Sequence, residues 1–169
     1  MLKTHQVILG SANLNNSSLS WVKYLGTEYM AYASENNVII NSLTSFIQIL
    51  KGHKEPITCI EWCDSLGKLI SCSKGKIIIF QPEEANFNLS EVFFFSTSSK
   101  FLSKVPPSIQ MQWKIEKTII LPDFDIKCVS WNPFGTRFLV AGKETRLYEL
   151  VSGNWMLKWK NINPTEVCF

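Results

Sequence analysis

The chain has 169 residues, of which 46% are hydrophobic and 18% are charged, and its formal net charge is +3. This composition is apolar enough for a folded core and excludes an intrinsically disordered segment. No apolar run reaches the roughly 18 residues of a membrane-spanning helix, and the first residues lack the apolar segment of a signal peptide, so we expect a cytosolic protein.

The N-terminal third predicts a group of short strands. Residues 5–10, with the sequence HQVILG, predict a strand, and the polar residues that follow predict a loop. Residues 21–50 then predict four strands with short polar turns between them. The last of these, FIQIL, alternates apolar and polar residues, which is typical of an outer strand with one wet face. The four predicted strands are 21–24, 29–33, 38–40 and 46–50.

Residues 52–121 predict a second group of four strands, opened by Gly52 and His53. Residues 57–62 are β-branched, aromatic and too few for a helix, so we expect a strand buried on both faces. Pro82 cannot donate to a strand ladder, and we expect it to end the third strand. The four predicted strands are 57–62, 68–72, 76–80 and 113–121, which leaves residues 81–112 as an insertion.

The insertion carries three consecutive phenylalanines, Phe93, Phe94 and Phe95. A long loop on a rigid scaffold often binds a partner, so these residues form a possible partner loop. Three exposed phenylalanines would also promote association. An extra strand, or packing against the second group of strands, is therefore the favoured alternative.

Residues 126–159 predict a third group, and residues 166–169 look like the first strand of a fourth. The three complete groups share a tryptophan followed by a turn glycine. The pairs are Trp21 with Gly26, Trp62 with Gly67, and Trp131 with Gly135. The strands predicted in the third group are 126–131, 137–141, 146–150 and 155–159.

The spacing of these tryptophans indicates a repeat architecture. Trp21 and Trp62 stand 41 positions apart (62 − 21), within the range of about 40 to 45 residues of a WD-type propeller blade. Trp62 and Trp131 stand 69 apart (131 − 62), which is consistent with an insertion in the second repeat.

The sequence therefore predicts an all-β fold, a partial WD-type β-propeller within residues 1–169. The three blades would be residues 21–50, 52–121 and 126–159, with residues 5–10 as an N-terminal closing strand and residues 166–169 as the start of blade four. Each blade leaves an open face that only the next blade covers. We therefore expect a fragment or short isoform that is aggregation-prone on its own.

The residues that could carry catalysis or bind a metal are sparse. The two histidines, His5 and His53, lie far from any catalytic motif, so we expect no enzyme and no cofactor. His53, Cys59 and Cys63 could be drawn as a zinc cluster, but their spacing is irregular and no fourth ligand is obvious. We therefore expect no metal site. The five cysteines are odd in number and include no CxxC pair, so reduced core side chains are expected.

His53 fits the Gly-His position of a WD-type blade, where the ring hydrogen-bonds within the blade. Blades of that family often carry an aspartate in the turn before the third strand, but residues 73–75 here are Ser-Lys-Gly. Phe80 and Tyr148 stand where the family often has tryptophan. We therefore expect degenerate blades that rely on apolar packing.

Several short segments resemble the N-terminus of DmX-like proteins, also called rabconnectins. Those segments are His5-Gln6-Val7 with Gly10, Ala12-Asn13, residues 31–34, Gln48-Ile49, residues 80–82 and residues 131–139. The resemblance implies a very large WD-repeat scaffold related to the large subunit of the RAVE complex. Its partners would be vacuolar-type proton-pump subunits and RAVE-like co-subunits, and its role would be pump assembly and vesicle or vacuole acidification. The location implied is cytoplasmic, peripheral to vesicle, endosomal or vacuolar membranes.

Other classes of function remain open. Blade motifs alone also fit a generic adapter, for example of a ubiquitin ligase or a trafficking complex. A phosphoinositide-binding propeller would carry an FRRG motif, which is absent, and Arg137 and Arg146 lie apart. The lysines are spread over predicted turns, where a solvated surface explains them better than a nucleic-acid or anionic-lipid patch.

Overall fold

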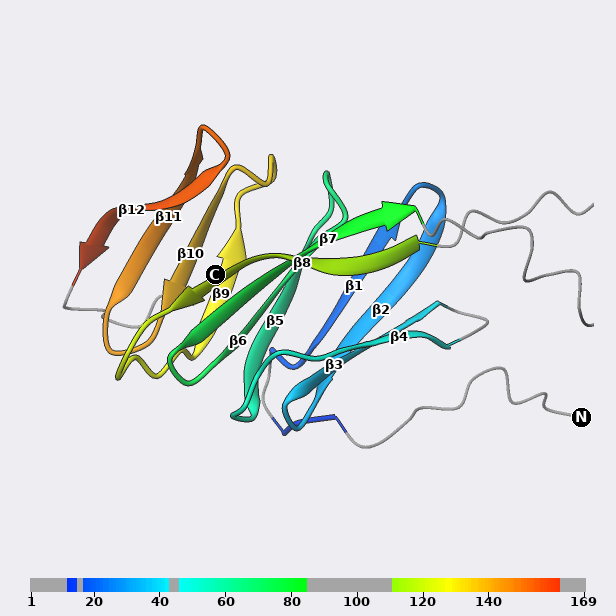
Figure 1. Cartoon of the computed structure of the whole chain (residues 1–169), viewed down its shortest axis with the longest axis horizontal. Helices are drawn as coiled ribbons and strands as arrows, with labels where there is room; N and C mark the ends of the chain where they lie inside the picture. Colours follow the sequence, from blue (N-terminus) through cyan, green and yellow to red (C-terminus); the bar gives the residue numbers. More distant parts are fainter. Residues whose placement is uncertain (1–11, 15–16, 43–45, 85–110, 162–169) are drawn as a thin grey trace, which may run out of the picture.

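The computed structural model describes residues 12–14, 17–42, 46–84 and 111–161, and the regular elements within these ranges are all β-strands. They form three four-stranded antiparallel sheets, each a simple meander of neighbouring strands. The sheets lie in a row and follow one another in chain order (Figure 1). This confirms the predicted all-β fold of three propeller-like blades.

Blade 1 consists of β1 (Leu19–Tyr24), β2 (Thr27–Ser34), β3 (Asn37–Ser42) and β4 (Phe46–Leu50). Blade 2 consists of β5 (Ile57–Cys63), β6 (Lys68–Ser73), β7 (Lys76–Glu84) and β8 (Met111–Ile120). Blade 3 consists of β9 (Cys128–Trp131), β10 (Arg137–Ala141), β11 (Thr145–Val151) and β12 (Asn154–Asn161).

Tight hairpins set the register of these sheets. Between β1 and β2, Leu25 and Gly26 both have positive φ, at 48° and 80°, and Ser152 and Gly153 repeat this between β11 and β12. Two consecutive left-handed residues form the hairpin turn whose twist matches that of the flanking strands. The short polar turns in the sequence therefore connect adjacent antiparallel strands.

The prediction that Pro82 ends the third strand of blade 2 is wrong. Strand β7 continues to Glu84, and Pro82 is paired with Trp113 of β8. The pairing of β7 with β6 reaches only as far as Phe80, so beyond it β7 has a single neighbour. A proline is tolerated on such an edge because one side of the strand has no partner.

Four predictions fall on parts of the chain outside the described residues. These are the closing strand at 5–10, the start of a fourth blade at 166–169, the partner loop of Phe93, Phe94 and Phe95, and most of the insertion. Because β7 ends at Glu84 and β8 begins at Met111, the segment between the two strands is residues 85–110.

Two apolar clusters hold the row of blades together. One joins blade 1 to blade 2 and includes Tyr29, Trp62 and Trp113, and the other joins blade 2 to blade 3 and includes Ile70 and Phe138. Blade 2 is thus covered on both faces, which explains why the sequence Ile-Ile-Ile-Phe of β7 does not alternate.

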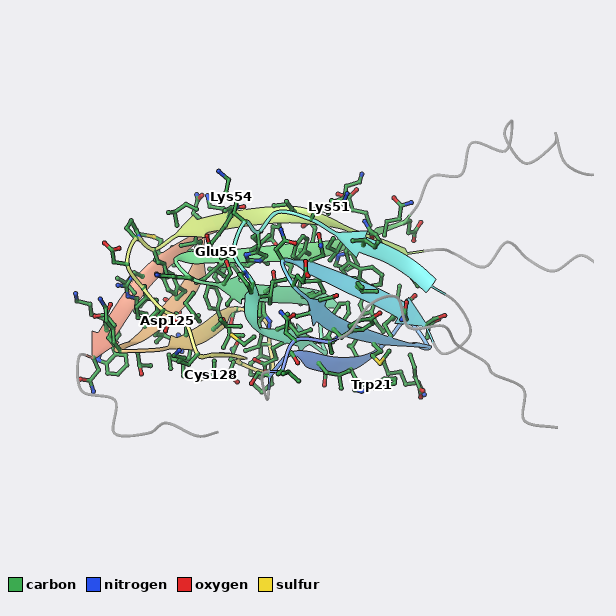
Figure 2. All side chains as sticks on the ribbon, turned by 90° about the horizontal axis from the view of Figure 1, so that it is seen from below. Trp21, Lys51, Lys54, Glu55, Asp125 and Cys128 are labelled. Atoms are coloured by element: carbon green, nitrogen blue, oxygen red, sulfur yellow. The ribbon has the colours of Figure 1, made fainter. Side chains whose placement is uncertain are left out.

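The inner strands contact each other from blade to blade. Strand β1 contacts β5, β5 contacts β9, and each second strand, β2 or β6, also reaches the first strand of the next blade. Figure 2 shows Trp21 of β1 and Cys128 of β9 on the inner edge of the row, with Lys51 and Lys54 on the opposite edge. The same strand contacts therefore recur between each blade and the next, as in a propeller.

Candidate interaction surface

His53 lies in the loop between β4 and β5, and its ring is buried within blade 2. Its Nδ1 lies 2.7 Å from Ser73 Oγ, and its Nε2 lies 2.7 Å from Ser71 Oγ. Both serines belong to β6 and are fully buried. The ring thus hydrogen-bonds within its blade, as the Gly-His position led us to expect, and two serine hydroxyls act where related blades often have an aspartate.

The environment of His53 favours a neutral ring. Burial lowers its pKa from the ordinary value of 6.5 to about 4, and the ammonium of Lys76 adds to the effect. Lys76 is held close by, because its Nζ donates a 2.5 Å hydrogen bond to the Gly52 carbonyl. With both ring nitrogens occupied, His53 is a structural residue rather than a general base.

Trp62 meets a second tryptophan that the sequence analysis did not single out. Trp113 enters from β8, and its Nε1 donates a 2.8 Å hydrogen bond to the Gly67 carbonyl. Its ring lies edge-on to Trp62, at 5.3 Å between centroids, and to Tyr29 of blade 1, at 4.9 Å. Trp113 therefore links the inner strand, the hairpin and the neighbouring blade.

Blade 3 repeats this arrangement with Trp155. Its ring lies 5.5 Å from Trp131 and 4.9 Å from Phe138. Trp113 and Trp155 both stand near the start of the fourth strand of their blades. A tryptophan at this position in two repeats is the sequence signal that could have identified them.

The turn glycines are contact points between successive blades. A Cβ placed on Gly67 would lie 2.6 Å from the Tyr24 ring of blade 1, and one on Gly135 would lie 2.5 Å from the Leu66 side chain of blade 2. A Cβ on Gly26 would meet no atom within 4 Å. The first hairpin thus has the same glycine but no described blade against it.

Gly67→Ala should therefore destabilise the protein more than Gly26→Ala. Both glycines have positive φ, which costs alanine about 1 kcal/mol. Only Gly67→Ala must also displace the Tyr24 ring, so we expect a further loss of about 1–3 kcal/mol in the free energy of unfolding. Denaturant unfolding of the two variants measures this difference, and equal losses would contradict the contact.

A hydrogen bond between blades recurs at the tryptophans of β5 and β9. The backbone N–H of Trp62 donates to Ser20 Oγ of blade 1, at 3.2 Å, and the backbone N–H of Trp131 donates to Glu61 Oε2 of blade 2, at 3.1 Å. Each acceptor stands one residue before the tryptophan of its own blade. The structure thus places Trp21, Trp62 and Trp131 at equivalent positions.

Glu61 is an unusual acceptor because it is a carboxyl group between two blades. Its Oε1 also receives a 3.3 Å hydrogen bond from Ser130 Oγ. Burial raises its pKa from 4.5 to about 7, although the hydrogen bonds from Trp131 and Ser130 oppose this rise. Sequence reasoning missed Glu61, since its partners come from a strand about seventy residues further along the chain.

The predicted motif residues divide into covered and uncovered sites. Trp62 is 4% exposed, whereas Trp21 is 51% exposed. A hollow of about 330 Å³ lies beside Trp21 and is lined also by Val22, Lys23, Glu28 and Asp64. A second hollow, of about 260 Å³, opens on the far side of blade 3 and includes Ser130, Leu139 and Leu147.

The described residues contain neither a cluster of side chains that could hold a metal ion nor a helix that could cross a membrane. Within the ranges that the structure describes, no three His, Cys, Asp or Glu side chains are grouped so that they could hold a metal ion. Cys63 lies at the hairpin beside Gly135, and His53 is bound to its serines, so these two residues do not act together. No helix long and apolar enough to cross a membrane occurs in the described ranges.

Comparison with known proteins identifies one repeat. Residues 44–81 match the WD40 family, described as WD domain, G-beta repeat. The matched segment includes β4, β5, β6 and the first six residues of β7, and it contains Gly52, His53, Trp62 and Gly67. No curated protein matches the chain.

Proposed function

We propose that this chain, a WD-repeat protein, forms part of a non-catalytic scaffold whose exposed surfaces bind other proteins. WD40 repeats mediate protein–protein interactions, and a propeller presents its rim and edge loops on rigid sheets. The observation that carries the proposal is that His53 and Trp62, the histidine and the tryptophan of the matched repeat, are occupied in holding the blade together.

The specific role that we propose is in a regulator of vacuolar-type proton-pump assembly, and hence of vesicle or vacuole acidification. Support comes from the segments that resemble DmX-like proteins, among them Ala12-Asn13 and residues 131–139. The partners would be pump subunits and RAVE-like co-subunits, and the protein would lie in the cytoplasm, peripheral to vesicle, endosomal or vacuolar membranes. Membrane association would then pass through these partners.

Affinity capture of the endogenous protein that carries this sequence tests the proposal. Mass spectrometry of the captured material is expected to show subunits of the peripheral sector of the pump. Cullin-type subunits would instead support a ubiquitin-ligase adapter, trafficking-complex subunits a trafficking adapter, and binding to protein-free vesicles a lipid reader; each of these outcomes without pump subunits would contradict the pump assignment.

A functional readout complements the capture. Deletion of the gene region that encodes this chain is expected to raise the pH of acidic organelles, measured with a ratiometric fluorescent probe. Re-expression of the intact protein should restore acidification. The Trp113→Ala variant, which removes the Trp113 contacts with Tyr29 of blade 1 and Trp62 of blade 2, should not restore it. Normal acidification after deletion would contradict the role.

A further inference from the structure

The two outermost sheet faces of the row are the two halves of an interface that the structure already contains twice. We call the face of a blade that meets the preceding blade its trailing face, and the opposite face its leading face. The trailing face of blade 2 packs on the leading face of blade 1, and blade 3 packs on blade 2 in the same way. The trailing face of blade 1 and the leading face of blade 3 have no described blade against them (Figure 1).

The trailing face of blade 1 repeats the apolar pattern of the covered ones. Cross-strand pairing places on one side of the sheet the residues Leu19, Trp21, Met30, Tyr32, Ile39 and Ile49. Leu19 and Trp21 are 48% and 51% exposed, whereas Ile60 and Trp62 at the equivalent positions of blade 2 are 3% and 4% exposed. The inner half of this face is therefore the part that a neighbour would cover, since Met30, Tyr32 and Ile39 are already buried.

The leading face of blade 3 has the complementary features. Leu139 and Leu147 are paired across β10 and β11 and stand where Ile70 and Ile79 stand in blade 2. They line the hollow of about 260 Å³, together with Ser130. In the blade 2–blade 3 interface, Trp131 packs against the cluster that contains Ile70 and Ile79. An incoming tryptophan equivalent to Trp131 would occupy the hollow in the same way.

Two further contacts of the existing interfaces have unused counterparts at the ends. Leu66, at the hairpin tip of blade 2, lies against Gly135 of blade 3; its counterpart Phe134 is 75% exposed, and Gly26 has open space where Gly135 has Leu66. Ser130 stands where Ser20 and Glu61 stand, and each of these accepts a hydrogen bond from the next tryptophan N–H. Its hydroxyl donates to Glu61 and can still accept a hydrogen bond.

We propose that a second copy of this chain docks head to tail, with Leu19 and Trp21 of one copy seated on the leading face of blade 3 of the other. The Trp21 side chain enters the hollow lined by Leu139 and Leu147, Phe134 covers Gly26, and the backbone N–H of Trp21 donates to Ser130 Oγ of the second copy. The surfaces joined are different, so the interface is heterologous. Two copies would present six blades, within the 4–8 blades typical of closed propellers, and an open series of copies is the alternative geometry.

Variants that block one face each test this proposal. Trp21→Asp places a charge on the trailing face of blade 1, and Leu147→Asp does so on the leading face of blade 3. Light scattering after size-exclusion chromatography of the full chain should show concentration-dependent association of the wild type. Each variant alone should associate at least 10-fold more weakly. Every head-to-tail contact joins one leading face and one trailing face, and in a solution of a single variant one of these two faces always carries the aspartate.

Mixing the two variants is the decisive step. The unaltered leading face of Trp21→Asp and the unaltered trailing face of Leu147→Asp are complementary. The mixture should therefore form one-to-one dimers, and nothing larger, because both outer faces of such a dimer carry an aspartate. Strong association of either variant alone, or a mixture that stays monomeric, would overturn the proposal. A monomeric wild type at concentrations of about 100 µM would overturn it as well, since such an interface should be populated there.

Two controls separate the interface from misfolding and from general stickiness. Ile120→Asp changes an apolar residue on β8 that is 60% exposed but lies on neither outer face, so it should associate as the wild type does. Leu19→Asp and Phe134→Asp repeat the mixing experiment at two exposed positions, where a loss of folding is least expected. Circular dichroism and a thermal melt establish that each variant is folded before it is scored.

Discussion

Replacing Trp113 with alanine is expected to lower the free energy of unfolding by about 3–5 kcal/mol. The ring is 1% exposed, and it contacts Trp62 in its own blade and Tyr29 in blade 1. Its loss would leave a cavity between two blades and would also remove the hydrogen bond to the Gly67 carbonyl. Urea unfolding followed by tryptophan fluorescence or circular dichroism measures the effect.

Trp159→Ala provides the matched control. Trp159 also lies on the outer strand of its blade, but it is 49% exposed, so its replacement should cost less than about 1 kcal/mol. If the two variants lost similar stability, the packing between blades 1 and 2 would not depend on Trp113. In the Trp159 variant, a loss of protection from hydrogen exchange that is limited to blade 3 would agree with the position of Trp159 on β12.

The second large effect concerns the pH dependence of stability, because buried His53 and partly buried Glu61 titrate in overlapping pH ranges with opposite effects on stability. The pKa of His53 is lowered to about 4 in the folded chain, mainly by burial and also by Lys76. Between pH 4 and 6.5 the unfolded chain therefore binds more protons at this residue than the folded chain does. Stability from His53 is present above pH 6.5 and is lost as the pH falls, by about 2 kcal/mol over this range.

Glu61 acts in the other direction. Burial raises its pKa to about 7, and the carboxyl group of Asp64 adds to the rise. Between pH 4.5 and 7 the folded chain binds more protons at Glu61 than the unfolded chain does, so stability falls as the pH rises. Because Glu61 is partly exposed, solvent screening reduces this contribution to about 1 kcal/mol.

The wild type should therefore show only a small change in stability between pH 4.5 and 6.5. Glu61→Gln keeps an acceptor for the Trp131 N–H but removes the titration, so its melting temperature should rise more steeply with pH than that of the wild type. His53→Gln should be less stable overall, and its stability should fall with rising pH. Thermal melts at half-unit pH steps measure the three slopes, and parallel curves would contradict both assignments.

Recurring local signals made much of the fold predictable. Short β-branched and aromatic runs, separated by turns with glycine, define strands of about the observed lengths, and the spacing of Trp21 and Trp62 indicated blades. The hydrogen bonds of His53 were also foreseen in kind, because the Gly52-His53 pair precedes a strand at the expected place. These features depend on residues close together in one blade.

Features that depend on contacts between two blades could not be predicted from the sequence. Trp21, Trp62 and Trp131 look alike in the sequence, yet their exposure differs because each depends on the sheet that precedes it. Pro82 was read as the end of a strand, since its neighbours in the sheet were unknown. Trp113 and Trp155 both begin predicted fourth strands, but their contacts with the inner-strand tryptophans were visible only in the folded blades.

The sequence by itself determined that this chain makes β-strands, where they turn, and that the same hairpin recurs three times, because turn chemistry and apolar alternation are local properties. Only the tertiary structure decided which residues lie between blades. Glu61 is a partly buried carboxyl group because Ser130 and Trp131 of another blade pack against it, and Trp21 is exposed because no described blade covers it. The physical reason is that burial, and with it pKa and contact energy, belongs to a pair of packed surfaces rather than to either surface alone.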